Sequence, residues 1–318
     1  MASRRTALLA VLLPPAAAWS AAKPGKTLRV GYLSPGGGDL RLLQPALAEL
    51  GFVDGRNVTY ESRLGPVEAA DRLARELVAS RPDLLIGVLN EYVRSLQRAT
   101  RSIPIVMMQV VDPVGQGLVK SLSRPGANTT GVTTLAELTW AKTVEIARTF
   151  APRAPAIGLL VAPRNTLHEQ VSSIVRDAVR SGGGNVIVYT THAVEYELDS
   201  AFAAAARAGV KVMLIAGGPP FVNMHNEIAL IGVKHGVGTA AGKAMFARSG
   251  ALFGYGMDTA AHYRDVAACV DRIANGADPA ILPVMQPSLF EFAINARRVR
   301  ELGFAIPSAL RISAEMVE

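Results

Sequence analysis

Leu28-Arg-Val-Gly-Tyr-Leu33 runs directly into Ser34-Pro-Gly-Gly-Gly38 near the start of the chain. A short apolar run that ends in small turn-forming residues is typical of a β-strand and the loop after it. Leu40, Leu43 and Leu47 then recur at helical spacing, which predicts an amphipathic helix. A strand, a loop and a helix in this order form the repeating unit of α/β folds.

The same unit recurs along the rest of the chain in two series. Continuous apolar runs at 84–89 and 103–108 are typical of strands that are buried on both faces. Further strands are expected at 57–61, 132–135, 156–161, 185–190 and 210–215, and helices at 67–80, 91–100, 138–150, 168–181, 195–208, 222–234 and 260–275. Two such series predict an α/β fold of two doubly wound parallel-sheet lobes.

The loops that follow the predicted strands are rich in Gly, Pro, Asn and Ser. Ligands of open parallel sheets bind at the carboxyl ends of the strands, so these loops hold the candidate ligand-binding residues. They are Ser34, Gly36, Asn90, Glu91, Asp112, Thr134, Asn165, Gly217, Tyr255 and Asp258. The small hydrogen-bonding groups and the two glycine backbones suit a carboxylate on the ligand, and the acids suit an ammonium. The tyrosine offers a flat apolar wall. We therefore expect a small polar or amino-acid-like ligand.

Two of these carboxylates have a structural alternative. Asp112-Pro113-Val114 follows a buried strand, and Asp is a favoured N-cap while Pro fits the first helical position. Asp112 is thus either a ligand contact or the cap of a segment that starts near Val114. Asp258 either faces the ligand or caps a helix that begins at Ala260, and the cap is the favoured interpretation.

No motif in the sequence points to catalysis, a cofactor or a metal. There is no G-x-S-x-G and no H-E-x-x-H, and Gly36-Gly37-Gly38 lacks the ending of a phosphate-binding loop. The five histidines fit no metal-ligand spacing and are expected to be exposed or hydrogen-bonded: 168, 192, 225, 235 and 262. The single cysteine, Cys269, lies in a helical apolar pattern and is predicted to be a core residue. We expect a binding protein without catalytic residues.

The first residues follow the order of a secretory signal peptide. Arg4 and Arg5 precede an apolar run from Ala7 to Ala18, and Ser20-Ala-Ala22 offers a cleavage site. The run is shorter than the roughly 20 residues that span a bilayer. Residues 1–22 are therefore predicted to be removed on export to the periplasm, by the general secretory or the twin-arginine route. Cys269 is far from this segment, so no lipid anchor is expected.

The formal net charge is +7, but Lys and Arg are dispersed among Asp and Glu rather than gathered in a block. This distribution is typical of a solvated surface and argues against nucleic acid as a partner.

An ordered series of short stretches resembles one family. The stretches are Glu49-Leu-Gly-Phe-Val-Asp-Gly-Arg-Asn57, Ser102-Ile-Pro-Ile-Val106, Asp112-Pro-Val114, Gly117-Leu-Val119, Ser121 to Gly131, Tyr255-Gly256 with Asp258, Leu282-Pro-Val-Met-Gln-Pro287, and Ile294-Asn295 through Leu302-Gly303 to Glu318. They are similar to the ABC-transporter substrate-binding family that includes tryptophan- and tyrosine-binding lipoproteins, which has the type I periplasmic-binding fold. Asn90-Glu91-Tyr92 and the small residues of 235–242 depart from the usual pattern of the family.

The resemblance implies a monomer that captures a small molecule between two lobes and delivers it to an ABC permease in the inner membrane. It also implies a three-segment hinge near 135–138, 254–257 and 283–287. Together with the two α/β series, it places one lobe at 27–136 plus 256–284 and the other at 137–255 plus 285–318. The alternative functions are an exported ligand sensor that presents its closed form to a membrane receptor and, less favoured, an exported α/β hydrolase.

Overall fold

A computed structural model describes residues 27–36, 38–218 and 220–318. The strands are β1 (Leu28–Ser34), β2 (Val58–Leu64), β3 (Leu84–Val88), β4 (Ile105–Val110), β5 (Thr129–Thr133), β6 (Ile157–Val161), β7 (Val186–Thr190), β8 (Val212–Ile215), β9 (Gly238–Ala241), β10 (Phe253–Met257), β11 (Phe290–Asn295) and β12 (Glu315–Val317). The predicted signal peptide at 1–22 lies outside the described residues.

The α-helices alternate with these strands through most of the chain. They are α1 (Gly38–Glu49), α2 (Ala70–Ala79), α3 (Asn90–Ala99), α4 (Ala136–Phe150), α5 (Thr166–Ser181), α6 (Glu195–Arg207), α7 (His225–Lys234), α8 (Met245–Arg248), α9 (Thr259–Ala274), α10 (Ala296–Glu301) and α11 (Ser308–Ser313). Short 3₁₀ turns at Val67–Ala69 and Phe221–Asn223 precede α2 and α7. Among the described residues, no helix is long and apolar enough to cross a membrane.

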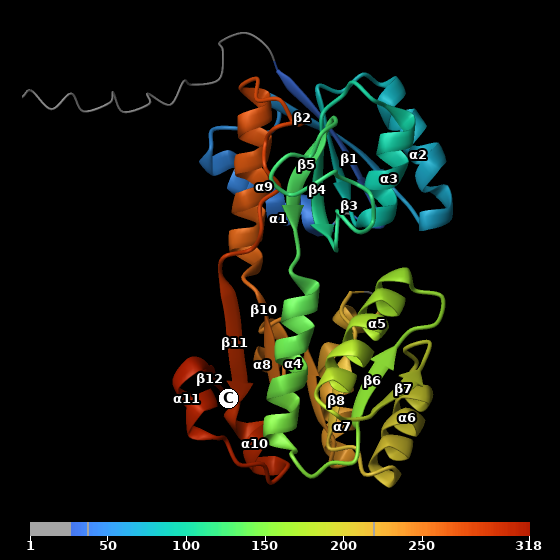
Figure 1. Cartoon of the computed structure of the whole chain (residues 1–318), viewed down its shortest axis with the longest axis vertical. Helices are drawn as coiled ribbons and strands as arrows, with labels where there is room; N and C mark the ends of the chain where they lie inside the picture. The colour runs from blue at the N-terminus through green and yellow to red at the C-terminus, as the bar shows by residue number, and fades with distance from the viewer. Residues whose placement is uncertain (1–26, 37, 219) are drawn as a thin grey trace, which may run out of the picture.

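The strands form two sheets, one in each half of an elongated molecule (Figure 1). The first sheet has the order β2-β1-β3-β4-β5, and all of its pairs are parallel. The second has the order β12-β11-β10-β9-β8-β6-β7 and is parallel except where β10 meets β11. Helices cover both faces of each sheet, so the prediction of an α/β fold with two doubly wound, mostly parallel sheets is confirmed.

Each half has its own apolar core. In the first half, α1 and α9 pack on one face of the sheet and α2 and α3 on the other. Cys269 is buried in the α9 contact, as the sequence pattern predicts. In the second half, one core lies under α4 and α5 and another under α6 and α7. α9 therefore belongs to the first core although it follows ten strands in the chain.

The chain passes between the halves three times (Figure 1). It leaves β5 for α4 through Thr134 and Leu135, leaves β10 for α9 through Asp258, and returns along 286–289 into β11. Just before this return, the Met285 amide donates a hydrogen bond to the carbonyl of Gly131 in the first sheet. The division into lobes of 27–136 plus 256–284 and 137–255 plus 285–318 stays our proposal for the domain limits.

The second sheet contains strands that the sequence pattern does not predict. β9 consists of Gly, Thr and Ala, has no large apolar residue, and is nevertheless fully buried. A Cβ atom at Gly238 would lie 2.7 Å from Leu252 Cδ2, so a side chain at this position would require Leu252 to shift. β11 and β12, near the C-terminus, extend the sheet beyond β10.

Candidate ligand-binding site

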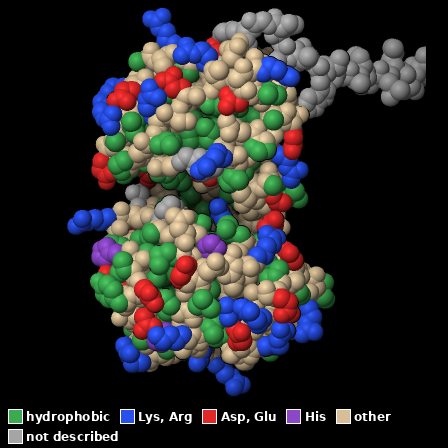
Figure 2. Space-filling model, turned by 180° about the vertical axis from the view of Figure 1, so that it is seen from behind, with side chains coloured by type: hydrophobic (Ala, Val, Ile, Leu, Met, Phe, Trp, Pro, Cys, Tyr) green, Lys and Arg blue, Asp and Glu red, His purple; other side chains and the backbone are tan. Residues whose placement is uncertain are grey.

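The carboxyl ends of the parallel strands of the two sheets face each other. In Figure 1 the arrows of β4 and β5 point toward the second half, and the arrow of β6 points toward the first. Figure 2 shows the surface hollowed across the middle, where the halves meet, with Lys or Arg atoms visible in the hollow. This is the edge at which open parallel sheets bind ligands.

Ser34, Asn90 and Thr134 lie at this edge of the first sheet, but their polar atoms serve the backbone. The Ser34 hydroxyl donates to the Gly36 carbonyl at 2.7 Å and accepts from the Gly36 amide at 3.2 Å. The Asn90 side chain holds both the carbonyl and the amide of Val111, at 2.7 and 3.0 Å. The Thr134 hydroxyl donates to the end of β4 at 3.2 Å. These side chains shape the edge and leave few free groups for a ligand.

Asp112 and Asp258 both accept a hydrogen bond from a backbone amide three residues further on, which is the geometry of a cap. Asp112 Oδ1 accepts from the Gly115 amide at 2.9 Å, within a run of turns rather than the helix expected near Val114. Asp258 Oδ1 accepts from the Ala261 amide at 2.8 Å and is the N-cap of α9. Glu91, half-buried in the first turn of α3, forms no side-chain hydrogen bond within the described part of the chain.

Asp258→Ala is expected to lower the free energy of unfolding by about 1 kcal/mol, because it removes the acceptor for an N-terminal amide of α9. Urea denaturation followed by circular dichroism measures this change. Asp258→Asn keeps a capping oxygen and should stay close to the unchanged protein. Equal stability of the alanine variant would contradict the capping role.

Asn165 and Gly217 follow strands of the second sheet and are joined by His168. Asn165 caps α5 by accepting from the His168 amide at 3.2 Å. His168 Nδ1 accepts from the Ala162 amide at 2.8 Å, so its Nε2 carries the proton and donates to the Gly217 carbonyl at 2.9 Å. Tyr255, half-buried in β10, stacks on Phe290 with ring centroids 5.8 Å apart.

A polar cluster that the sequence does not single out lies between α1, β4 and α9. Asp39 Oδ1, in the first turn of α1, accepts from the Tyr263 hydroxyl at 2.5 Å and from Gln109 Nε2 at 2.8 Å. Burial and the Asp39 carboxylate raise the pKa of Tyr263, which keeps the phenol protonated as a donor. Asp39 Oδ2 accepts no hydrogen bond from a described residue. One oxygen of a firmly held carboxylate is therefore left for a ligand.

Three further groups around this cluster lack partners. Both ring nitrogens of His262 and the hydroxyl of Tyr32 are buried without a hydrogen bond, in the part of the chain that the structure describes. The expectation that every histidine is exposed or hydrogen-bonded is thus wrong for His262. The Lys243 ammonium, which interacts electrostatically with Asp39 and His262, forms no hydrogen bond or ion pair with a described residue.

Buried polar groups in proteins are almost always paired, so these unpaired groups gathered around Asp39 indicate a place where a polar molecule binds. We define the Asp39 cluster as Tyr32, Asp39, Gln109, Lys243, His262 and Tyr263. Burial lowers the pKa of His262 to about 4, and the charge of Lys243 acts in the same direction. Burial also lowers the pKa of Lys243, while Asp39 opposes that shift.

The stability of the protein is expected to depend on pH through His262. Below its ordinary pKa of 6.5, the unfolded chain binds a proton at His262 that the folded chain binds only near pH 4. Stability therefore falls as the pH drops from about 6.5 to about 4, by about 3 kcal/mol. Urea denaturation across this range should show a smaller loss for His262→Gln. Equal pH dependence of the two proteins would contradict the buried neutral imidazole.

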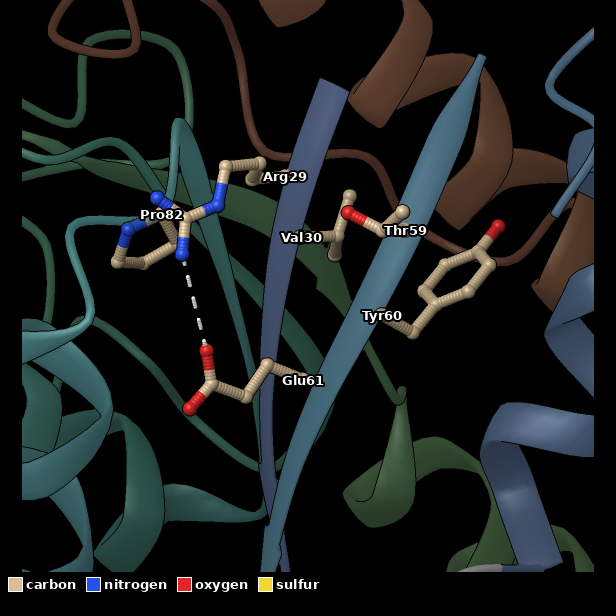
Figure 3. Close-up of a pocket in the computed structure, with 6 residues that line it drawn as sticks. All are labelled: Arg29, Val30, Thr59, Tyr60, Glu61 and Pro82. Atoms are coloured by element: carbon tan, nitrogen blue, oxygen red, sulfur yellow. Dashed lines mark ion pairs between the residues drawn. The ribbon is translucent and has the colours of Figure 1, made fainter. Parts of the chain in front are cut away.

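A separate surface pocket lies at the opposite edge of the first sheet. Figure 3 shows Arg29 and Glu61 pointing toward each other beside Pro82, with Tyr60 turned the other way. The ion pair has an N–O distance of 4.0 Å and is half-exposed, so it contributes little. Arg29 is the second residue of β1 and Glu61 lies in the middle of β2, away from the carboxyl ends of the strands.

The described residues offer no metal site or reactive cysteine. No group of three or more His, Cys, Asp or Glu among them could hold a metal ion. Burial raises the pKa of Cys269 to about 12, so its thiol stays protonated at neutral pH.

Solved structures share the fold of this chain. A conserved domain protein from Vibrio cholerae has a TM-score of 0.78 and 24% identity, and the match covers 92% of this chain and 100% of the other. The ABC domain in complex with L-Trp from Streptococcus pneumonia has a TM-score of 0.76 and 22% identity, with the same coverage. These similarities show a type I periplasmic-binding fold.

Two comparisons of sequence bear on the family. A tyrosine-binding protein of Clostridioides difficile is 32% identical over 117 residues, which make up 36% of this chain and 33% of that protein. The match thus spans about a third of that relative's length. The family model described as ABC transporter substrate binding protein matches residues 40–318, nearly the whole described structure. The chain belongs to this family of substrate-binding proteins, as its ordered motifs predict.

Proposed function

We propose that this chain is the solute-binding component of an ABC transporter. It captures a small polar or amino-acid-like molecule between its two halves and presents it to a permease in the inner membrane. The observation that carries the proposal is the Asp39 cluster, a set of polar groups short of partners at the edges where the two sheets face each other.

The cluster suits an amino group on the ligand. Asp39 is held through Oδ1 by Tyr263 and Gln109, which leaves Oδ2 to accept from an ammonium. A charge-assisted hydrogen bond of this kind is about twice as strong as a neutral one. The names of two similar proteins, a tyrosine-binding protein and a domain bound to L-Trp, favour an aromatic amino acid. Tyr255 and Phe290 offer stacked aromatic surface for such a side chain.

Binding would be coupled to closure of the two halves about the three crossing segments. A ligand favours the closed form only to the extent that it binds that form more tightly. We further propose that the protein acts as a monomer in the periplasm after removal of residues 1–22, without a lipid anchor. A ligand sensor would use the same site, but the description of the matched family favours transport.

Calorimetric titration with L-tyrosine and L-tryptophan tests the proposal, with D-glucose as the control. We expect at least one aromatic amino acid to bind one-to-one with micromolar or tighter affinity, equivalent to about 8 kcal/mol. Failure of every protein amino acid to bind would contradict the proposal. Binding of the sugar instead would retain a solute-binding role and reject the ligand class.

A further inference from the structure

Lys243 occupies a rigid position at the carboxyl edge of the second sheet. Gly242 separates it from the end of β9, and its backbone packs directly on β10. A Cβ atom at Gly254 would lie 2.1 Å from the Lys243 carbonyl oxygen, and one at Gly256 would lie 2.0 Å from the Gly242 carbonyl oxygen. Two glycines therefore allow the turn that carries Lys243 to lie against the strand that leads to α9. Residues placed by packed strands hold their positions better than residues on free loops.

No described group neutralises the Lys243 ammonium. It forms no hydrogen bond or ion pair with a described residue, and the lysine is only partly exposed. His262 is neutral above about pH 4 and carries no negative charge in either protonation state, so it cannot neutralise the ammonium. The carboxylate that acts on Lys243 is Asp39, which comes from the other half and is not in contact with it. A partly buried ammonium without a protein partner loses some of its hydration, and an anionic group on a ligand would compensate for that loss.

The two halves thus contribute opposite charges to one site. Asp39, from the first half, has one oxygen free, and Lys243, from the second half, has no partner. The sum of these charges is zero, which fits a ligand that is itself neutral overall but carries one positive and one negative group. A carboxylate alone would leave Asp39 without a cation, and an amine alone would leave Lys243 without an anion.

We propose that Lys243 is a specificity-determining residue that binds the carboxylate of the ligand, so that a zwitterion bridges Asp39 of one half and Lys243 of the other. This inference rests on the proposed function and adds the requirement for a free carboxylate. It also makes charge recognition part of closure, because each end of the ligand is held by a different half. Simple amines and esterified amino acids would bind one half only.

Calorimetry with matched ligands tests the inference. L-tyrosine and L-tryptophan carry both charges, tyramine and tryptamine lack the carboxylate, and the methyl esters keep the ammonium but mask the carboxylate. The unchanged protein should bind the better amino acid at least about tenfold more tightly than its amine or ester, as expected for a hydrogen bond between charged groups. Lys243→Met should bind the amino acid no more tightly than the amine, while Lys243→Arg should retain part of the preference.

Lys211→Met is the matched control, because Lys211 is exposed and lies outside the Asp39 cluster. Thermal melting verifies that each variant folds, and Lys243→Arg keeps the test valid if Lys243→Met does not. An undiminished preference for the carboxylate in Lys243→Met overturns the inference and leaves the proposed function standing. Equal affinity of the unchanged protein for the amino acid and for its amine also overturns the inference and leaves the proposed function standing. If no amino acid binds to the unchanged protein, both the inference and the proposed function are rejected.

Discussion

Asp39→Asn is expected to weaken the binding of an aromatic amino acid by about a thousandfold. The substitution keeps an oxygen that Tyr263 and Gln109 can bond, so the fold of the cluster is retained. It removes the negative charge, and the ligand ammonium is then buried without a counter-ion. Loss of one partner of a buried ion pair costs about 3–5 kcal/mol, which corresponds to roughly two to four orders of magnitude in affinity. Calorimetric titration measures the change.

The matched control is Asp112→Asn. Asp112 also lies at the carboxyl edge of the first sheet, but it is exposed and bonds the Gly115 amide. The affinity of the Asp112→Asn variant for the ligand should stay within about twofold of that of the unchanged protein, since a cap affects stability rather than binding. A loss of less than about tenfold in Asp39→Asn, or an equal loss in Asp112→Asn, would remove Asp39 from the binding site.

Gly256→Ala is expected to lower the free energy of unfolding by about 4 kcal/mol or more. The new Cβ would lie 2.0 Å from the Gly242 carbonyl oxygen, a backbone atom that cannot move without shifting the turn between β9 and α8. Losses of this size are exceptional for one substitution and arise where packing or backbone geometry is directly violated. The same shift would displace Lys243, so ligand affinity should fall as well. Urea denaturation followed by circular dichroism gives the stability.

Gly217→Ala provides the comparison for the glycine prediction. No atom lies within 4 Å of a Cβ built at Gly217, and its φ is not in the left-handed region. Its stability should therefore stay within about 0.5 kcal/mol of the unchanged protein. If Gly256→Ala were as stable as Gly217→Ala, the close approach of β10 to the turn that carries Lys243 would be wrong.

The central strands β3 and β4 of the first sheet could be predicted from the sequence because both are mainly apolar runs. Leu84–Val88 is buried along its whole length, as a central parallel strand should be. β9 could not be predicted, since its Gly, Thr and Ala residues have no apolar periodicity. It is a strand because β8 and β10 pair with it on either side, which is tertiary information.

The sequence also indicated the edge of the sheets at which the candidate site lies, but it did not single out the Asp39 cluster. Strand-end loops drew attention to Asn90 and Asp112, whose side chains satisfy backbone groups of sharp turns. Asp39 stands just after the glycine-rich loop and has the pattern of an ordinary acidic residue in a first helical turn. Its partner Tyr263 is on α9, more than two hundred residues further along the chain. Only the packing of α9 against α1 brings them together.

His262 carries no signal in the sequence that separates it from a satisfied core histidine. It lies next to Tyr263 in the first turns of α9, where the sequence predicts an exposed or hydrogen-bonded histidine. What distinguishes it is that neither ring nitrogen forms a hydrogen bond with a described residue, together with the electrostatic influence of Lys243 from the other half. Both conditions arise from how the two halves meet.

Native mass spectrometry of the chain after incubation with a mixture of the protein amino acids tests the central claim most directly. The account predicts a single non-covalent adduct with the mass of one amino acid on the unchanged protein and on Lys211→Met. The adduct should be lost or strongly depleted on both Asp39→Asn and Lys243→Met. An adduct of the same mass and occupancy on all four proteins would contradict the account, because the ligand would then be held somewhere other than between Asp39 and Lys243.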